Sequence, residues 1–235
     1  MKQLHPLLLY FMIVVSCTNH NQFISNSGTI AKNAMVSSAH PLASAIGLGI
    51  MKNGGNAIDA AIATHFALTV VYPQAGNIGG GGFAVIRMND GTINSLDFRE
   101  KAPALAHRDM YLNAEGQLND LQSTHGHMAS GVPGSVDGMF TLHQKYGTLP
   151  MSELIEPSIE MARRGYVLTP LAAELLNAKQ EEFQTYNRWS TPYHSDENWQ
   201  AGDTITQPDL AQTLEHIQSN GRNGFYEGIV ADQIV

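Results

Sequence analysis

Arg99 is the side chain whose type and position point most directly to chemistry. It lies in residues 97–103, DFREKAP, at the end of a run that reads as a buried strand. A guanidinium is planar and offers a fork of hydrogen-bond donors that matches a carboxylate in bidentate fashion. An arginine at a strand end therefore suits the recognition of an acidic substrate. The residues alone also allow a simpler interpretation, in which Arg99 forms a salt bridge with Asp97 or Glu100.

A glycine-rich loop, residues 76–82, precedes the strand that leads to Arg99, and its positions 79–82 are four consecutive glycines. The loop follows a predicted helix and precedes a predicted strand, whereas a dinucleotide-binding loop follows a strand and opens a helix. No Gly-Lys-Ser/Thr occurs either, so a nucleotide site is not indicated. The glycines predict backbone that passes very close to a ligand or to another segment, or alternatively a tightly packed turn.

Metal and serine-hydrolase chemistry find little support in the residues. His125 and His127 form the only closely spaced pair among the 10 histidines, and no His-Glu-x-x-His or cysteine cluster is present. We therefore expect no metal site and no cofactor. Residues 134–138, GSVDG, have the wrong spacing for a Gly-x-Ser-x-Gly nucleophile elbow, so no serine stands out as a nucleophile.

The composition limits the class of protein. Hydrophobic residues make up 43% of the 235 residues, enough to build a substantial core. The formal net charge of -8 leaves no basic footprint for nucleic acid, and we expect no such partner. No repeat or linker divides the body, so residues 29–235 are interpreted as one unit.

The N-terminus is predicted to be an export signal. Residues 1–16 contain a positively charged start and an apolar run at 7–15, which is shorter than the roughly 20 residues of a bilayer span. Cys17, the only cysteine, follows directly, and residues 14–17, VVSC, resemble a bacterial lipobox, although leucine is commoner where Val14 stands. The resemblance implies cleavage before Cys17, acylation of its thiol and a periplasmic, membrane-anchored protein with a polar tether over residues 17–28. A plain signal peptide with an incidental cysteine is the alternative.

The elements expected to position the glycine loop and Arg99 are two helices and a hairpin. Apolar spacing predicts helices over residues 41–52 and 57–71, the second beginning at an N-cap, Asn56. Strand-like runs at 83–88 and 92–99 are joined by Asn-Asp-Gly, a strong hairpin signal. Because both faces of these strands are largely apolar, we expect them to be covered on both sides. Helix, strands and further helices together predict a layered α/β architecture.

Further helices are expected toward the C-terminus. The patterns predict a helix over 139–145, one that begins at Pro157 and ends at Gly165, one from Thr169 to about residue 184, and one from Pro208 to about 221. Residues 229–235 begin an apolar helix face without a C-cap signal, which predicts that the chain is cut short.

Seven blocks of the chain together resemble the γ-glutamyltransferase (glutathione hydrolase) family, and they occur in the family's order. The likeness covers roughly Thr29 to Val235, and any single block would be weak. The blocks are NGGNAIDAAIA at 53–63, GNIGGGGF at 76–83, DFREKAP at 97–103, GVPG at 131–134, Glu156-Pro157 with Ala162 and Gly165, QPDLAQTL at 207–214, and FYEG at 225–228.

The resemblance implies the N-terminal nucleophile hydrolase fold, a four-layer αββα sandwich whose precursor cleaves itself into a large and a small subunit. The small subunit's new N-terminal threonine attacks the γ-glutamyl amide of a substrate such as glutathione, and water or an amino acid or peptide accepts the acyl group. Matched to the family, Arg99 clamps the substrate α-carboxylate, and glycines 79–82 pack beside the site.

The resemblance also implies what these residues lack. The nucleophilic threonine and the small subunit are expected beyond Val235, so half of the sandwich is absent, apolar faces meant for that subunit are exposed, and the chain alone is inactive. Thr124 and His125 superficially resemble the family's cleavage site but precede the GVPG block. The alternative is a non-enzymatic lipoprotein remnant that binds acidic ligands through Arg99. Substrates with cephalosporin side chains or poly-γ-glutamate also stay open.

Overall fold

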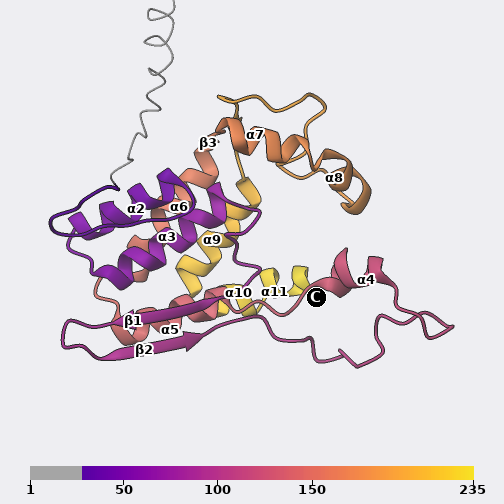
Figure 1. Cartoon of the computed structure of the whole chain (residues 1–235), viewed down its shortest axis with the longest axis horizontal. Helices are drawn as coiled ribbons and strands as arrows, with labels where there is room; N and C mark the ends of the chain where they lie inside the picture. The colour runs from indigo at the N-terminus through magenta and orange to yellow at the C-terminus, as the bar shows by residue number, and fades with distance from the viewer. Residues whose placement is uncertain (1–27) are drawn as a thin grey trace, which may run out of the picture. The chain divides into compact units, whose positions relative to one another are not determined.

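The computed structural model describes residues 28–235 (Figure 1). The predicted signal peptide, the predicted lipidation site at Cys17 and nearly all of the predicted tether lie outside the described residues. The chain divides into two units, Met1–Asn33 and Ala34–Val235. The described part of the first unit, residues 28–33, is exposed and contains no helix or strand. All elements named below belong to the second unit.

The second unit is mostly helical, with two small antiparallel sheets (Figure 1). Among residues 28–235, no helix combines the length and apolar character that a membrane span requires. In chain order the elements are α2 (Pro41–Lys52), α3 (Ala57–Val71), β1 (Phe83–Arg87), β2 (Ile93–Asp97), α4 (Asp120–Thr124), η1 (His127–Ala129), α5 (Ser135–Tyr146), α6 (Met151–Arg164), β3 (Tyr166–Val167), α7 (Pro170–Asn177), α8 (Gln180–Tyr186), β4 (Thr204–Ile205), α9 (Pro208–Asn220), α10 (Asn223–Tyr226) and α11 (Ile229–Ile234).

Helix α3 is the centre of the helical core. It contacts α2, α5 and α6, and α6 in turn contacts α9. Ten of its fifteen residues are buried, because its apolar and small side chains surround the whole helix rather than one stripe. The small alanine side chains of α3 allow the neighbouring helices to pack closely against it. The Phe66 side chain lies in the core and has no exposed surface.

A capping box fixes where α3 begins. The Asn56 side chain accepts hydrogen bonds from the backbone N–H of Ile58 and Asp59, at 2.7 and 2.9 Å, and the Asp59 carboxylate accepts from the backbone N–H of Asn56 at 2.9 Å. Asp59 is fully buried and also accepts from the backbone N–H of Thr148 at 3.0 Å. Burial would raise the pKa of Asp59, but the hydrogen bonds from Thr148, Asn56 and Leu149 hold it below its usual range. The cap therefore also ties α3 to the turn after α5.

The hairpin β1–β2 forms at the predicted turn, and its strands are slightly shorter than the predicted runs 83–88 and 92–99. Phe83 pairs with Asp97 and Arg87 with Ile93, and Gly91 takes a φ of +87° in the turn. The Met88 N–H donates to the carbonyl of Thr92 at 2.8 Å. The hairpin thus carries the chain from the glycine loop directly to Arg99.

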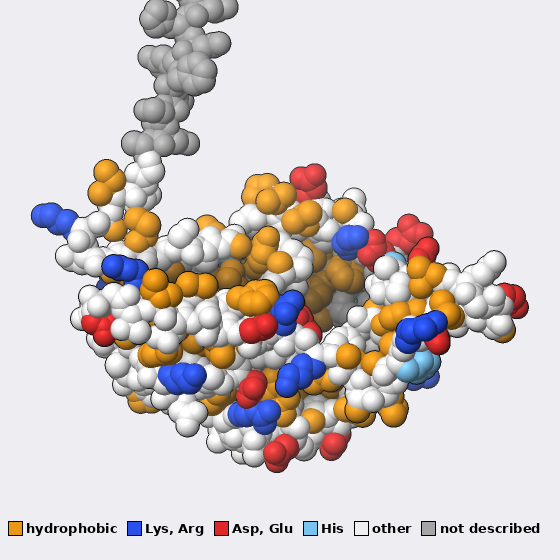
Figure 2. Space-filling view, turned by 60° about the horizontal axis from the view of Figure 1, so that its bottom comes forward, with side chains coloured by type: hydrophobic (Ala, Val, Ile, Leu, Met, Phe, Trp, Pro, Cys, Tyr) orange, Lys and Arg blue, Asp and Glu red, His pale blue; other side chains and the backbone are white. Residues whose placement is uncertain are grey.

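The expectation that these strands are covered on both sides is wrong for the described residues. The side chains of Ile86 and Leu96 pack on the core, but Phe83, Val85 and Ile93 on the other face are 64%, 79% and 67% exposed. Hydrophobic side chains also reach the surface elsewhere on the molecule (Figure 2). The apolar residues identified the strands correctly, but no described element lies on their outer face.

Two other helix predictions need correction. Helix α6 starts at Met151, not at Pro157, which lies inside it. Proline removes one helical hydrogen bond, yet the helix continues because Leu154, Ile155 and Ile159 are buried against its neighbours. The helix predicted from Thr169 to about 184 is interrupted, since α7 ends at Asn177 and α8 begins at Gln180.

The remaining helix boundaries follow their sequence signals. Helices α2 and α3 have the predicted limits, and α9 begins at Pro208 and ends one residue before Gly221. The predicted helix 139–145 is real but begins earlier, at Ser135, because the GVPG turn leads straight into α5.

Candidate functional site

Three of the motif blocks meet around Arg99. The Gly134 N–H donates to the carbonyl of Gly80 at 2.8 Å, which joins the GVPG turn to the glycine loop. Lys101 and Val132 exchange backbone hydrogen bonds at 3.0 and 2.8 Å, which joins the same turn to the segment after β2. Segments far apart in sequence are therefore held together by their backbones at the end of the hairpin.

The glycines at this junction are needed for close approach. A Cβ placed on Gly81 would come within 2.6 Å of the Arg99 Cα, and one on Gly134 would overlap the carbonyl oxygen of Phe98. Any side chain at these positions would force the segments apart. Of the two uses predicted for the glycine loop, the structure shows close passage against another segment, namely the backbone of Arg99.

Arg99 is an exposed side chain held in place by its neighbours. Its Nε and Nη2 donate to the Asp97 carboxylate at 3.4 and 3.3 Å, and its backbone N–H donates to the same carboxylate at 3.0 Å. These hydrogen bonds hold the pKa of Asp97 below its usual range. The guanidinium carbon lies 4.9 Å from the centroid of the Phe83 ring. The side chain is 61% exposed, and its Nη1 donates to no other group within residues 28–235.

The ion pair predicted as the simpler interpretation of Arg99 therefore exists, with Asp97 as the partner. It does not use up the donors of the guanidinium. An anchored and oriented arginine with free donors remains able to bind a carboxylate.

A cavity of about 240 Å³ lies next to Arg99. Three cationic side chains, Arg99, Lys101 and Arg222, line it together with Asp97 and Asp137. Arg222 forms an ion pair with Asp137. The lining therefore carries three positive and two negative side chains, an excess of positive charge that favours an anionic group.

Arg222 and Tyr226 are site residues that the sequence did not reveal. The Tyr226 hydroxyl donates to the carbonyl of Pro133 at 2.9 Å and accepts from the backbone N–H of Asp137 at 3.2 Å. The guanidinium of Arg222 stacks over the Tyr226 ring, 4.5 Å from its centroid. Tyr226 belongs to the FYEG block, which was the available signal, but nothing in the spacing placed Arg222 near Arg99.

His65 supports the site from behind. Its ring meets that of Phe98 edge to face with centroids 6.4 Å apart. Burial lowers the pKa of His65 to about 4, so the imidazole is neutral near pH 7. Its Nε2 has no hydrogen-bond partner among the described residues. The histidine therefore acts here as an apolar packing group under the residue that precedes Arg99.

The closely spaced histidines do not join this site. His125 stacks on Tyr186, with ring centroids 4.5 Å apart, and none of the residues that line the cavity beside Arg99 is a histidine. Within residues 28–235, no group of three or more His, Cys, Asp or Glu side chains is arranged to hold a metal ion.

The sequence is similar to one protein family over most of its length. Residues 43–235 match the family model described as γ-glutamyltranspeptidase. The chain is 43% identical over 224 residues to a glutathione hydrolase proenzyme of Pseudomonas sp. strain A14, covering 94% of this chain and 39% of that protein. It is 41% identical over 213 residues to the glutathione hydrolase proenzyme of Escherichia coli K12, covering 87% of this chain and 36% of that protein. The chain thus spans less than two fifths of these relatives.

Solved structures show the same likeness. The γ-glutamyltranspeptidase of Helicobacter pylori superposes with a TM-score of 0.82 at 45% identity, covering 88% of this chain and 60% of that chain. The enzyme of Pseudomonas nitroreducens, in a complex with L-DON, superposes with a TM-score of 0.78 at 37% identity, over 88% of this chain and 60% of that chain. These neighbours confirm the predicted N-terminal nucleophile hydrolase fold, of which the described residues form a mixed α/β part.

Proposed function

This chain belongs to the γ-glutamyltranspeptidase family, and from that premise we propose that it forms part of a γ-glutamyltransferase or glutathione hydrolase. Its substrate is a γ-glutamyl compound such as glutathione. The observation that carries the proposal is the junction at Arg99, where the glycine loop and the GVPG turn hold an exposed, oriented guanidinium beside a cavity rich in cationic groups.

In the proposed reaction a threonine hydroxyl oxygen bonds to the γ-carbonyl carbon of the substrate. The threonine's own α-amine takes the hydroxyl proton and returns it to the departing amine as the amide C–N bond breaks. The resulting acyl-enzyme ester is then opened by water or by an acceptor amine. The threonine belongs to a part of the precursor outside these 235 residues, so the chain alone has no turnover in this proposal.

Arg99 binds the α-carboxylate of the γ-glutamyl group. Asp97 holds the guanidinium through Nε and Nη2, and Nη1 remains available to the substrate. A charge-assisted hydrogen bond of this kind contributes about 1.5–3 kcal/mol. The contact holds the substrate by the α-carboxylate, which every γ-glutamyl compound shares and which lies away from the γ-amide bond that reacts.

The outer face of the hairpin is the proposed contact for the small subunit. Phe83, Val85 and Ile93 present a row of apolar side chains there, and β1 and β2 pair only with each other in the described part of the chain. A two-stranded sheet with one bare apolar face is marginal on its own in water. A second sheet packed on this face would cover these side chains and complete a sandwich of the family's kind.

The decisive experiment measures release of the γ-glutamyl group from glutathione by the protein made from the full reading frame. We expect activity from the parent and a drop in kcat/KM of about 10- to 100-fold for Arg99→Ala, mainly through KM. Arg108→Ala is the matched control, because Arg108 is 93% exposed and lies outside the cavity. A parent without activity that still binds glutamate through Arg99 would instead support the acidic-ligand binder.

The proposal includes export and lipid anchoring through Cys17, which rests on the VVSC pattern alone. Radioactive palmitate should label the parent but not Cys17→Ser, and the variant should move from the membrane fraction to the soluble periplasmic fraction. Labelling that persists in Cys17→Ser would contradict the anchor, and a soluble parent would favour the plain signal peptide.

A further inference from the structure

A second cavity, away from Arg99, lies under helices α7 and α8. It has a volume of about 390 Å³, within the roughly 300–1,000 Å³ typical of small-molecule pockets. We call it the α7 pocket. Among its lining residues are Tyr166, Leu171, Leu175, Lys179, Phe183 and Tyr193.

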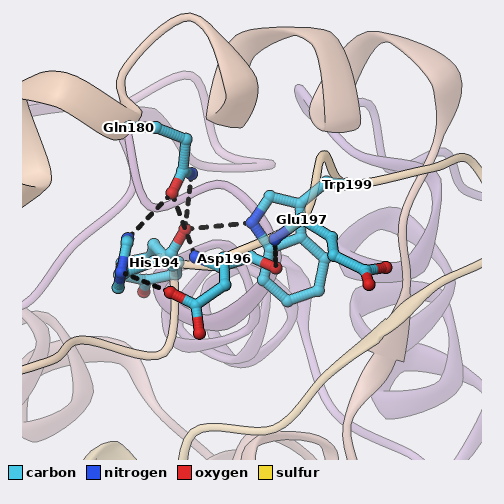
Figure 3. Close-up of polar contacts among 7 residues, drawn as sticks. Gln180, His194, Asp196, Glu197 and Trp199 are labelled. Atoms are coloured by element: carbon cyan, nitrogen blue, oxygen red, sulfur yellow. Dashed lines mark hydrogen bonds and ion pairs between the residues drawn. The ribbon is translucent and has the colours of Figure 1, made fainter.

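The walls of the α7 pocket are held by side-chain hydrogen bonds. Gln180 donates from Nε2 to the carbonyls of Leu176 and Tyr193, at 3.0 and 2.9 Å, and its Oε1 accepts from the backbone N–H of Ser195 at 3.0 Å. Figure 3 shows Gln180 facing the loop that carries His194 and Trp199. One glutamine thereby fixes an irregular loop against the start of α8.

Two consecutive buried hydrogen bonds, from Tyr193 through Gln207 to Val70, hold the same loop at a second point. The Tyr193 hydroxyl donates to Oε1 of Gln207 at 2.7 Å, and Nε2 of Gln207 donates to the carbonyl of Val70, in α3, at 2.8 Å. Gln207 is 1% exposed, so both bonds are shielded from water. These hydrogen bonds hold the loop that forms one wall of the pocket in place.

The polar groups that line the α7 pocket favour an acceptor. Tyr166 is 4% exposed, and its hydroxyl forms no hydrogen bond within residues 28–235. Lys179 provides an ammonium group, which donates to Glu182 at 2.6 Å and retains two further donors. No Asp or Glu side chain lines the pocket. An apolar interior with hydroxyl donors, whose only Lys, Arg, Asp or Glu lining residue is Lys179, matches an anion that carries an apolar body and that competes with Glu182 for the ammonium group.

From this lining we infer that the α7 pocket binds a medium-chain carboxylate, with its hydrocarbon among the leucines and Phe183 and its carboxylate at Lys179. The site is separate from the one at Arg99, since the two cavities share no lining residue. Binding here is therefore expected to be independent of the γ-glutamyl substrate.

The test is calorimetric titration of the protein made from its full reading frame with hexanoate, heptanoate and octanoate. Each added methylene should tighten binding about threefold to fourfold while the pocket still has room. Octylammonium, which has the same chain and the opposite charge, should bind at least tenfold more weakly than octanoate. Equal affinity for the two octyl compounds, or no dependence on chain length, would overturn the inference.

Variants locate the binding. Ala172→Phe fills the pocket and should abolish octanoate binding, whereas Glu174→Phe, on the same helix but outside the pocket, should leave it. Lys179→Met should weaken octanoate about tenfold but leave octanol unchanged. Leu175→Ala changes a side chain that is 44% exposed, so it should fold even if Ala172→Phe does not, and it should weaken octanoate severalfold. Octanoate binding that Leu175→Ala and Lys179→Met leave intact would place the ligand elsewhere.

Discussion

The helix α3 and the hairpin β1–β2 both contain large apolar side chains but bury them very differently. Phe66 in α3 is fully buried, whereas Phe83 in β1 is 64% exposed. The α3 helix has neighbours on several sides within the chain, while the hairpin has the core on one face only. Within the described residues, the side chains of α3 are therefore covered by other helices of the chain, whereas the outer face of the hairpin is not covered.

The largest expected effect comes from truncating a side chain at the centre of the helical core. Phe66→Ala should lower the free energy of unfolding by about 3–5 kcal/mol, because it removes a fully buried ring and leaves a cavity. Phe83→Ala removes the same ring from the exposed face and should cost less than about 1 kcal/mol. Urea unfolding of the two variants measures the difference directly, and equal losses would mean that the hairpin face is covered.

The capping box gives the next largest effect. Asp59→Ala leaves buried N–H donors of Asn56 and Thr148 without an acceptor and should cost about 3 kcal/mol. Asp209→Ala, an exposed aspartate in the first turn of α9, should cost only about 0.3–1 kcal/mol.

Because the pKa of Asp59 is lowered in the folded state, the direction in which the free energy of unfolding changes with pH can be predicted. The ionised Asp59 carboxylate makes its full contribution to stability above its pKa in the unfolded state, about 3.9. That contribution is lost as the pH falls through the lower pKa of the folded state. Asp59→Asn should remove that part of the acid sensitivity, and an unchanged acid transition would show that the carboxylate is not ionised in the fold.

His65 predicts a smaller, pH-dependent effect at the border of the two regions. Its pKa falls from about 6.5 unfolded to about 4 folded, so the unfolded state binds the proton first. The neutral His65 therefore costs the fold nothing above about pH 6.5. Below that pH the free energy of unfolding falls by at most about 1.4 kcal/mol per pH unit, until about pH 4.

Denaturant titrations at several pH values test this slope. His65→Leu should flatten it, while His107→Leu, at an exposed position, should not. A parent slope that survives in His65→Leu would assign the acid sensitivity to other groups, of which His40, with a pKa also lowered by burial, is one.

The smallest effect is expected on the outer face of the hairpin. Val85→Thr should change the free energy of unfolding of this chain by less than about 0.5 kcal/mol, since the side chain is 79% exposed. In the protein made from the full reading frame, the same variant should cost about 1–2 kcal/mol if the small subunit covers it. A neutral effect in both would remove the hairpin from the proposed interface.

Local signals in the sequence were reliable where the structure depends on local chemistry. Asn56 predicted the start of α3, and Asn-Asp-Gly predicted the hairpin, because capping and turn formation involve only neighbouring residues. Pro157 misled for the same reason: the local rule starts a helix there, but burial of Leu154 and Ile159 extends α6 through it.

The candidate site was only partly predictable. Arg99 was found because its block resembles a known family, and its partner Asp97 lies two residues away. Arg222 was missed because it reaches the same cavity from 123 positions further along the chain, and no periodicity connects such positions. Close approach was predicted for the glycine loop that contains Gly81, but not against which segment, and the close approach at Gly134 was not predicted.

The bond between Gln207 and the carbonyl of Val70 has a consequence for synthesis. The two residues are 137 positions apart, so α3 leaves the ribosome long before its last turn can be completed. At translation rates of about 5–20 residues per second, the delay is on the order of ten seconds. During that interval the Val70 carbonyl lacks its buried partner and the end of α3 is free to fray, even though α2, α5 and α6, which contact the helix, all emerge before Gln207.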